Sequence, residues 1–313
     1  MYGTQAVNGV IVVTTKRGKV GSPVVSYKNT FSVGIKPNIT QFNVMNSKQR
    51  MEFSEEMYDK NLIDFTNLNQ TYGAYGKLLN QLSTKQIDWN GFYDGIQRAK
   101  TYNTDWFDVL FRNSINQEHS VSISSGTEKA QYYMSASYFR DDGQTKGQYT
   151  DRYTANLRGN YNLSDKFTLT ASLYASIRNQ RMFGAYNSTE AVTGIVEREF
   201  DINPYTYART TSRAMRPYGD DGSLEFYQTN FAPFNIIHEL ENNFIDIKAR
   251  EVKFQLDGKW NIAKKLTYLG IVSGRMSSAY SEHIATEKSN VAESYRAMQS
   301  LAIRSANGLL YND

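Results

Sequence analysis

Several residues and patterns that common functions require are missing from this sequence of 313 residues. Cysteine is absent, which excludes a disulfide framework and a thiolate metal site. Only three histidines occur, His119, His238 and His283, and their spacing does not suit a shared metal ion. The motifs of nucleotide-binding loops, zinc proteases and serine hydrolases are also absent. We therefore expect no enzyme active site, no cofactor and no metal site.

Long apolar runs are missing as well. No segment approaches the roughly 20 apolar residues that a membrane-spanning helix needs, and the first residues lack the order of basic, apolar and small residues that marks a secretory signal. The mean hydropathy is −0.57. A membrane β-barrel also has a low average, because its residues alternate between lipid and lumen. The sequence thus excludes helical membrane proteins and leaves barrels open.

Charge of one sign is not concentrated anywhere along the chain. The 35 basic and 31 acidic residues are interspersed and the net charge is only +4, so no nucleic-acid partner is expected. Aromatic residues are plentiful by contrast, at 13% with 23 tyrosines. Tyrosine suits the belts where a membrane protein meets the boundary between water and lipid, although a soluble β-sandwich also uses it.

The middle of the chain alternates strictly between apolar and polar residues. In "YTANLRGNY", residues 153–161, and "FTLTASLYASI", residues 167–177, one face is small, apolar and aromatic, and the other is hydroxylated or amidic. The short turn between them predicts an antiparallel hairpin, with one face suited to acyl chains and the other to water. Similar patterns predict about seven strands in all, the others at residues 23–35, 118–126, 130–140, 252–262 and 266–280.

The predicted connections alternate in length. Short turns lie near Thr127, Ser164 and Lys264, whereas the long, irregular segments are residues 36–116, 179–243 and 281–313. Short connections on one side and long ones on the other are typical of outer-membrane barrels, and a soluble β-sandwich with long functional loops is the alternative. In the first long segment, Asn46 and Gln49 form a capping pattern that predicts one short helix at residues 46–58.

Three stretches resemble one known family. "YGTQAVNGVIVVTTKRG", residues 2–18, is similar to the end of the plug domain in the SusC/RagA type of TonB-dependent outer-membrane transporters. "TDWFDVLFRNSINQEHSVSISSGTEKAQYYMSASYFRDDGQTKG", residues 104–147, resembles the second and third barrel strands, and Arg152 with Tyr153 fits the entry to the next hairpin. The departures are small: Thr4, Gln5, Val7 and Ser125 stand where the family more often has other residues.

The resemblance implies an all-β fold and a division of the chain. It implies a partial transmembrane antiparallel β-barrel of about 7 of about 22 strands, with long extracellular loops and one short helix. Residues 1–21 would be the C-terminal end of the plug domain, and residues 22–313 the N-terminal part of the barrel, ending in a loop. We expect Met1 to occupy an internal position of a longer protein, so that the chain is a fragment.

Two sets of residues are candidates for functional roles. The plug-end motif, which we assign to plug folding, comprises Tyr2, Gly3, Asn8, Gly9, Val10, Thr14, Thr15, Lys16 and Gly18. Its valine-rich core lacks alternation, as expected of a strand buried on both faces. Aromatic residues of the long connections either stack on cargo or pack the loops, and we favour packing for each single ring, with Trp106 as a loop anchor. They are Trp89, Phe92, Tyr93, Trp106, Phe107, Tyr205, Tyr207 and Tyr218.

The resemblance also implies a function without chemistry. A family member takes up an oligosaccharide or a peptide through the outer membrane, surrounded by outer-membrane lipid. A SusD-like surface lipoprotein closes over its mouth, and TonB acts through upstream segments that this chain lacks. Import is our first hypothesis. A secreted carbohydrate-binding β-sandwich protein is the second, and an outer-membrane barrel enzyme is the third.

Overall fold

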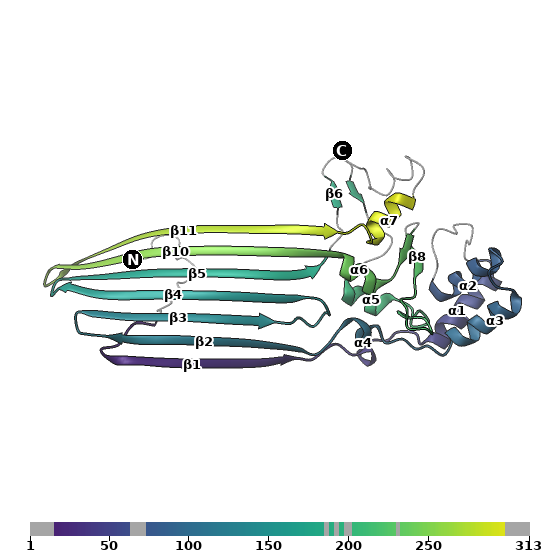
Figure 1. Cartoon of the computed structure of the whole chain (residues 1–313), viewed down its shortest axis with the longest axis horizontal. Coiled ribbons are helices and arrows are strands. Elements are labelled where there is room, and N and C mark those ends of the chain that lie inside the picture. The colour runs from purple at the N-terminus through teal and green to yellow at the C-terminus, as the bar shows by residue number, and fades with distance from the viewer. Residues whose placement is uncertain are drawn as a thin grey trace.

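The computed structural model describes residues 16–62, 73–184, 188–190, 194–196, 202–229 and 232–297. They form a seven-stranded antiparallel sheet with a group of helices at one end (Figure 1). The sheet strands are β1 (Gly21–Gly34), β2 (Ser114–Gly126), β3 (Ala130–Asp141), β4 (Tyr149–Ser164), β5 (Phe167–Phe183), β10 (Asn243–Ala263) and β11 (Leu266–Ala285). Two small hairpins pair β6 (Ser188–Glu190) with β7 (Gly194–Val196), and β8 (Tyr227–Thr229) with β9 (Ala232–Phe234).

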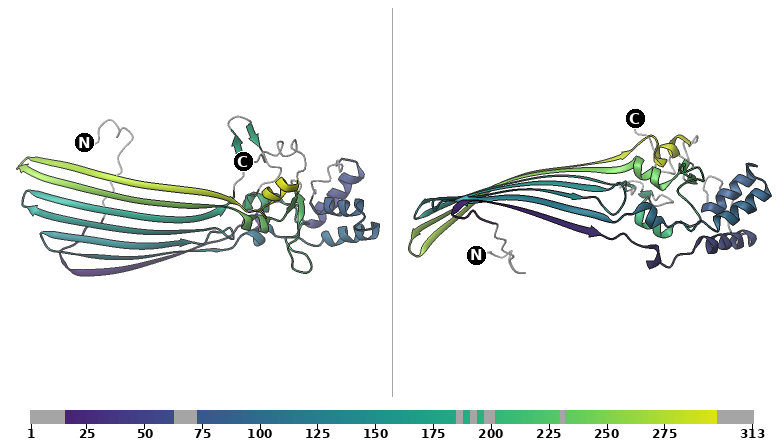
Figure 2. Two further views of the ribbon diagram at one scale, coloured as in Figure 1. Left: turned by 45° about the horizontal axis from the view of Figure 1, so that its top comes forward. Right: turned by 60° about the horizontal axis from the view of Figure 1, so that its bottom comes forward.

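The seven strands stand side by side in the order in which they occur in the chain. The order is β1-β2-β3-β4-β5-β10-β11, and every neighbouring pair is antiparallel. The seven strands expected from the alternation are therefore confirmed. β1 and β11 are the edge strands, and neither has an outer neighbour in the described residues. Figure 2 shows that the sheet is twisted and curved, so that it has the form of an open wall segment.

The connections differ in length at the two ends of the sheet. Residues 127–129, 165–166 and 264–265 make tight turns at one end. At the other end, residues 142–148 form a loop, and residues 35–113 and 184–242 carry six of the seven described α-helices, as Figure 1 shows. The expected alternation between short and long connections is thus present in the structure.

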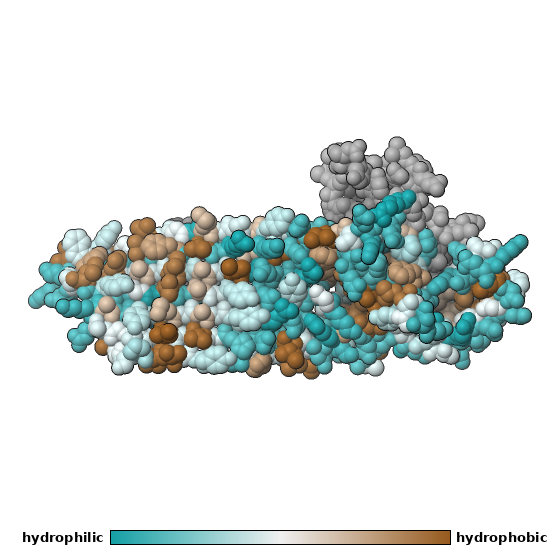
Figure 3. Space-filling model, in the orientation of Figure 1, coloured by the Kyte–Doolittle hydropathy of each residue, from teal (hydrophilic) through white to brown (hydrophobic). Residues whose placement is uncertain are grey.

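One face of the sheet is apolar and uncovered in the described residues. In register, Met134 lies opposite Leu157, Leu157 opposite Leu173, and Leu173 opposite Phe254. All four are exposed. Figure 3 shows apolar residues gathered over the part of the sheet that is farther from the helices. Such a surface needs an apolar environment to cover it.

Aromatic residues border this apolar band on both sides. Toward the loops, Tyr138 and Tyr153 are stacked with ring centroids 5.0 Å apart. Toward the tight turns, Trp260 lies opposite both Phe167 and Tyr268. On β10 the outward apolar residues of the band lie within residues 252–262, a length that matches the 9–11 residues that cross a bilayer at a tilt. The band therefore has the dimensions and the aromatic borders of a membrane-facing surface.

The strands continue beyond the band, toward the loops, farther than the sequence pattern indicated. There the outward face becomes charged: Arg140 pairs with Asp151 at 2.7 Å, and Arg181 pairs with Asp246 through two hydrogen bonds of 2.8 Å. Because both faces are polar in this part, alternation is lost, although the backbone ladder continues. The pattern thus located the apolar part of each strand and missed the polar extensions of strands such as β4, β5 and β10.

The long connections contain more helix than expected. The expected helix is present as α1 (Ser47–Asp59), capped by Asn46, whose side chain accepts a hydrogen bond from the backbone of Gln49 at 2.9 Å. The expectation of a single helix is wrong, however, because six further α-helices occur in the described residues. They are α2 (Gly73–Ser83), α3 (Trp89–Ala99), α4 (Trp106–Leu110), α5 (Pro204–Thr210), α6 (Ile236–Asn242) and α7 (Asn290–Ala297). None of the described helices is long and apolar enough to cross a membrane.

Candidate functional site

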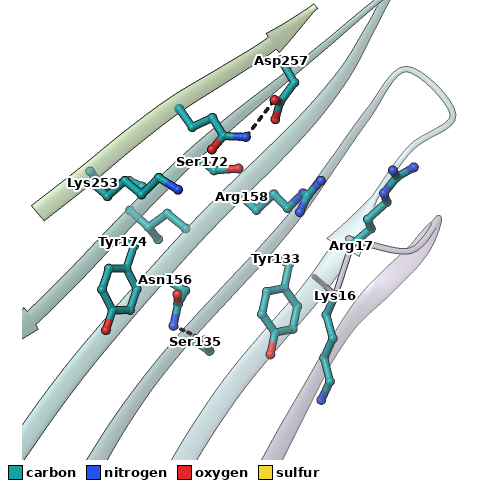
Figure 4. Close-up of a pocket in the computed structure, with 13 residues that line it drawn as sticks. Lys16, Arg17, Tyr133, Ser135, Asn156, Arg158, Ser172, Tyr174, Lys253 and Asp257 are labelled. Atoms are coloured by element: carbon teal, nitrogen blue, oxygen red, sulfur yellow. Dashed lines mark hydrogen bonds between the residues drawn. The ribbon is translucent and has the colours of Figure 1, made fainter. Parts of the chain in front are cut away.

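The polar face of the sheet is hollowed next to the start of the described chain. A hollow of about 670 Å³ opens on this face. Figure 4 shows that its side chains come from β3, β4, β5 and β10 and from the segment before β1. They include Lys16, Arg17, Tyr133, Ser135, Asn156, Arg158, Ser172, Tyr174, Lys253, Gln255 and Asp257.

Hydrogen bonds between side chains organise part of this wall. Asn156 donates to Ser135 at 3.3 Å, and Gln255 donates to Asp257 at 2.8 Å. Two buried donor atoms, Nε of Arg158 and Nδ2 of Asn160, have no hydrogen-bond partner among the described residues. Buried polar atoms are normally paired. The wall therefore presents donors to acceptors that come from water or from groups outside the described residues.

The segment before β1 lies against this wall. Lys16 and Arg17 line the hollow, and the backbone N–H of Lys19 donates to the hydroxyl of Ser124 at 3.1 Å. Gly18 is buried, and a Cβ atom at this position would lie 2.5 Å from the backbone nitrogen of Tyr132. Only glycine allows such a close approach between two backbones. The other residues of the plug-end motif, Tyr2, Gly3, Asn8, Gly9, Val10, Thr14 and Thr15, lie outside the described residues.

The hollow is basic. The charged residues among its described lining are Lys16, Arg17, Arg158 and Lys253, together with one carboxylate, Asp257. Fixed charges of one sign on the wall of a cleft attract groups of the opposite sign. The wall can therefore hold anionic or acceptor-rich groups, whether these come from the protein itself or from cargo.

Half of the candidate aromatic residues are buried in the loop region. Phe92, Trp106, Phe107 and Tyr207 are between 0% and 8% exposed. They belong to two hydrophobic clusters, one around Trp106 and Phe107 and the other around Phe92. A ring enclosed in this way cannot stack on cargo, so these residues hold the loops together.

Trp106 joins the two longest connections. Its indole N–H donates to the carbonyl of Ser212 at 3.0 Å, and its ring meets that of Tyr207 edge-on. Next to it, Thr104 and Arg213 exchange backbone and side-chain hydrogen bonds between 2.9 and 3.1 Å. These contacts link positions more than 100 residues apart in sequence. The two connections therefore pack together at the helical end of the sheet.

The remaining candidate aromatic residues are exposed. Trp89 and Tyr93 lie on successive turns of α3 with ring centroids 6.1 Å apart, and both are more than half exposed. Tyr205 and Tyr218 are also exposed, at 43% and 46%. These four rings are available to a partner, and the structure brings Trp89 and Tyr93 together as one patch.

A network of charges braces the loop that follows α5. Arg216 pairs with Asp220 and, at 2.5 Å, with Glu225, which also pairs with Lys77 of α2 at 2.8 Å. The hydrogen bond from the Arg216 guanidinium lowers the pKa of Asp220. Burial raises the pKa of Tyr227, whose hydroxyl accepts a hydrogen bond from the backbone N–H of Arg216. In the chain as described, no three histidine, cysteine or acidic residues lie close enough to hold a metal ion.

Two relatives with assigned roles are similar to this chain in sequence. The TonB-dependent receptor SusC of Bacteroides thetaiotaomicron is 30% identical over 158 residues, which is 50% of this chain and 12% of SusC. The TonB-dependent receptor P39 of Formosa agariphila is 25% identical over 193 residues, or 61% of this chain and 15% of P39. The chain thus spans less than a sixth of the length of these relatives. No family model matches the chain.

Solved structures with a similar fold come from a related kind of protein. The RagAB peptide importer in its 'open-open' state superimposes with a TM-score of 0.64 over 90% of this chain and 31% of that chain, at 18% identity. Its 'closed-closed' state gives a TM-score of 0.62. At this level of identity the likeness concerns the fold, and the fold agrees with the sequence relatives. The chain therefore resembles part of a SusC/RagA-like TonB-dependent receptor, both in its sequence and in its fold.

Proposed function

We propose that this chain is part of an outer-membrane importer for bulky nutrients. The observation that carries the proposal is the sheet itself: one face is apolar with aromatic borders, the other is polar, and both edges are unpaired in the described residues. Unpaired backbone groups cost several kcal/mol each in hydrocarbon. Further strands that close the wall into a barrel would remove this cost.

In this proposal the chain has two parts. Residues 1–21 form the end of the plug, and residues 22–313 form the first part of the barrel with its extracellular loops. The contacts of Lys16, Arg17 and Gly18 with the polar face support this division, because a plug must lie against the lumen wall. β1 begins at Gly21, where the proposed barrel starts.

The proposed cargo is an oligosaccharide or a peptide, and the proposed partners are a SusD-like lipoprotein and TonB. The name of SusC and the description of RagAB as a peptide importer support this class of function. We expect TonB to act through plug segments upstream of these residues. The exposed rings Trp89, Tyr93, Tyr205 and Tyr218 are the proposed contacts of the loops with cargo or with the lipoprotein.

The second hypothesis, a secreted β-sandwich, has less support. A sandwich buries its apolar side chains between two sheets. In the described part of the chain, the other sheets are two-stranded hairpins, and Leu157, Phe254 and their neighbours in the apolar band stay exposed.

Cell fractionation with the full receptor tests the proposal. We expect the protein in the outer membrane, with a gel mobility that changes on heating, as closed barrels show. Deleting its gene should abolish growth on one class of oligosaccharide or peptide, and a plasmid copy should restore it. A water-soluble protein with heat-independent mobility would contradict the proposal.

A further inference from the structure

Two arginines lie side by side on the polar face of the sheet, and among the described residues they have no carboxylate partner. Arg152 of β4 is directly opposite Arg178 of β5, and both are exposed. Like charges directly opposite each other destabilise a sheet. On the opposite face the neighbouring arginines are neutralised, Arg140 by Asp151 and Arg181 by Asp246. In the described residues neither Arg152 nor Arg178 forms such an ion pair, so this pair attracts an anion.

The pair faces an open space. Both arginines line a hollow of about 400 Å³ on the polar face, beside Ser176 and Ser277. In register, Arg178 lies opposite Ala249, which lies opposite Ala279. The short side chains of these two alanines leave space beside Arg178. Arg152 is held on its other side by Phe139, with the guanidinium carbon 5.0 Å from the ring centroid. The arrangement combines two planar donors, hydroxyl groups and room for a ligand.

Among the described residues, one carboxylate lines this hollow, and it is already paired. Glu251 accepts from Arg275 at 2.9 Å, so its charge is shared with a third arginine and does not neutralise the pair. Removing the carboxyl charge of Glu251 would free Arg275 and make the hollow more positive. The affinity of the site for an anion can therefore be lowered by removing the arginines and raised by removing the charge of Glu251.

The pair lies on the loop side of the segment that contains Lys16 and Arg17. Arg152 precedes Asn156, which lines the larger hollow, by four residues of the same strand, or about 13 Å. Cargo that enters from the loops would reach the arginines before it reached this segment. We propose that Arg152 and Arg178 bind a carboxylate of the imported oligomer, so that the receptor prefers acidic oligomers. This inference rests on the proposed import function.

The geometry favours a carboxylate for a physical reason. Guanidinium groups offer parallel N–H donors that match the two oxygens of a carboxylate, and such charge-assisted bonds are the stronger ones. Acidic peptides and uronic acid oligosaccharides both carry this group. The proposed ligand is therefore an oligomer that carries carboxylates. Separate peptide and oligosaccharide probes distinguish the two kinds of oligomer.

The test measures binding to the full receptor, purified in detergent, by calorimetry. The probes are a tetraglutamate peptide and a tetragalacturonate, with a neutral tetrapeptide and a neutral tetrasaccharide as references. We expect one acidic probe to bind at least tenfold more tightly than its neutral reference, and this preference to decrease with salt. Equal affinity for acidic and neutral probes would overturn the inference and leave import intact, whereas failure to locate the receptor in the outer membrane would overturn import itself.

Three variants identify the site. Arg152→Gln with Arg178→Gln should weaken binding of the acidic probe about tenfold or more and leave the neutral reference unchanged. Glu251→Gln should strengthen binding of the acidic probe a few-fold. Lys28→Gln is the matched control, since it removes one positive charge from the same face on β1. If Lys28→Gln weakens binding as much as the double variant, or if the double variant lowers only the melting temperature, the arginines serve another role and the inference is wrong.

Discussion

The sheet and the loop helices are stabilised in opposite ways. In the loop region, Trp106 and Phe107 are 1% and 0% exposed, and their cluster is closed by residues of the same chain. In the sheet, side chains of similar character, such as Leu173 and Phe254, are exposed on one face. The loop region thus contains its own hydrophobic core, whereas the apolar face of the sheet requires a covering from outside the described residues.

The two regions are therefore stabilised by the burial of different apolar surfaces. Burial of a large apolar side chain contributes about 1.5–3 kcal/mol when water is excluded, and the loop region obtains this from its own packing. In the proposed function, the sheet obtains it from lipid and from closure by further strands. Substitutions in one region should therefore leave the other unchanged.

The largest effect is expected for Trp106→Ala. Truncating a buried tryptophan costs about 3–5 kcal/mol, and this variant also removes the hydrogen bond to Ser212. Because the ring joins two connections, both should open together. Hydrogen exchange of residues 89–110 and 204–216 in the full receptor measures this loss, while the strands should keep their protection.

Trp89→Ala is the matched control within the same connection. Trp89 is 55% exposed, and substitutions at such positions usually change stability by about 0.5 kcal/mol or less. If both variants increase exchange equally, burial does not distinguish the two rings and the loop region has no rigid core.

The next effect concerns the sheet. Leu173→Lys places a charge in the middle of the apolar face, where Leu157 and Phe254 lie opposite it. In a bilayer this costs about 2–4 kcal/mol near the midplane. Denaturant titration of the full receptor in lipid vesicles measures this cost, and loop protection should not change.

Ser172→Lys is the control for the two faces. Ser172 is the preceding residue of the same strand, and its side chain points to the polar hollow. Because water can reach this face, the variant should be much milder, even though Arg158 lies opposite it. Equal costs for the two substitutions would show that the assignment of the faces is wrong.

The same comparison explains what the sequence could predict. Strands are local, and the alternation in residues 153–161 and 167–177 was enough to locate them and to assign their faces. The polar extensions of the strands were missed because Asp151 and Arg181 make both faces polar. A ladder of backbone hydrogen bonds needs no alternation, so no periodic signal marks its end.

The helices of the loops were missed for a different reason. Asp88 caps α3 and Asn203 caps α5 at its proline, and both signals are visible in the sequence. Gly95, however, lowers helix propensity within α3. A Cβ atom there would lie 2.5 Å from the Cδ2 methyl carbon of Leu78 of α2, so the glycine makes room for this leucine. The glycine is explained by packing between two helices, which the local sequence does not reveal.

Trp106 was expected to anchor a loop, but its partners in the loop core could not be predicted from local patterns. The bond from Trp106 to Ser212 joins residues 106 positions apart. Trp106 and Trp89 look alike in sequence, since each follows an aspartate that caps a helix. Only packing separates the anchor from the exposed ring.

The smallest effect is expected at the charged edge of the loop region. The hydrogen bond and charge of Arg216 lower the pKa of Asp220 below its ordinary value of 3.8. A carboxylate with a lowered pKa in the folded state contributes stability above that ordinary value, and the contribution is lost as the pH falls through the lowered pKa. Acidification from pH 5 should therefore loosen this loop.

Asp220→Asn makes this expectation measurable. Pepsin cleavage within residues 212–225 can be followed between pH 2 and pH 5 in the full receptor, and the ratio of the rates for variant and wild type removes the pH dependence of the protease. Asp221 also has a lowered pKa, through hydrogen bonds from Ser223, but it titrates in both proteins and cancels in the ratio. The ratio should exceed one near pH 5 and fall toward one as the pH decreases through the lowered pKa of Asp220. A ratio that does not change with pH would show that the pair with Arg216 adds nothing to the loop, and that the hydrophobic core alone holds this region.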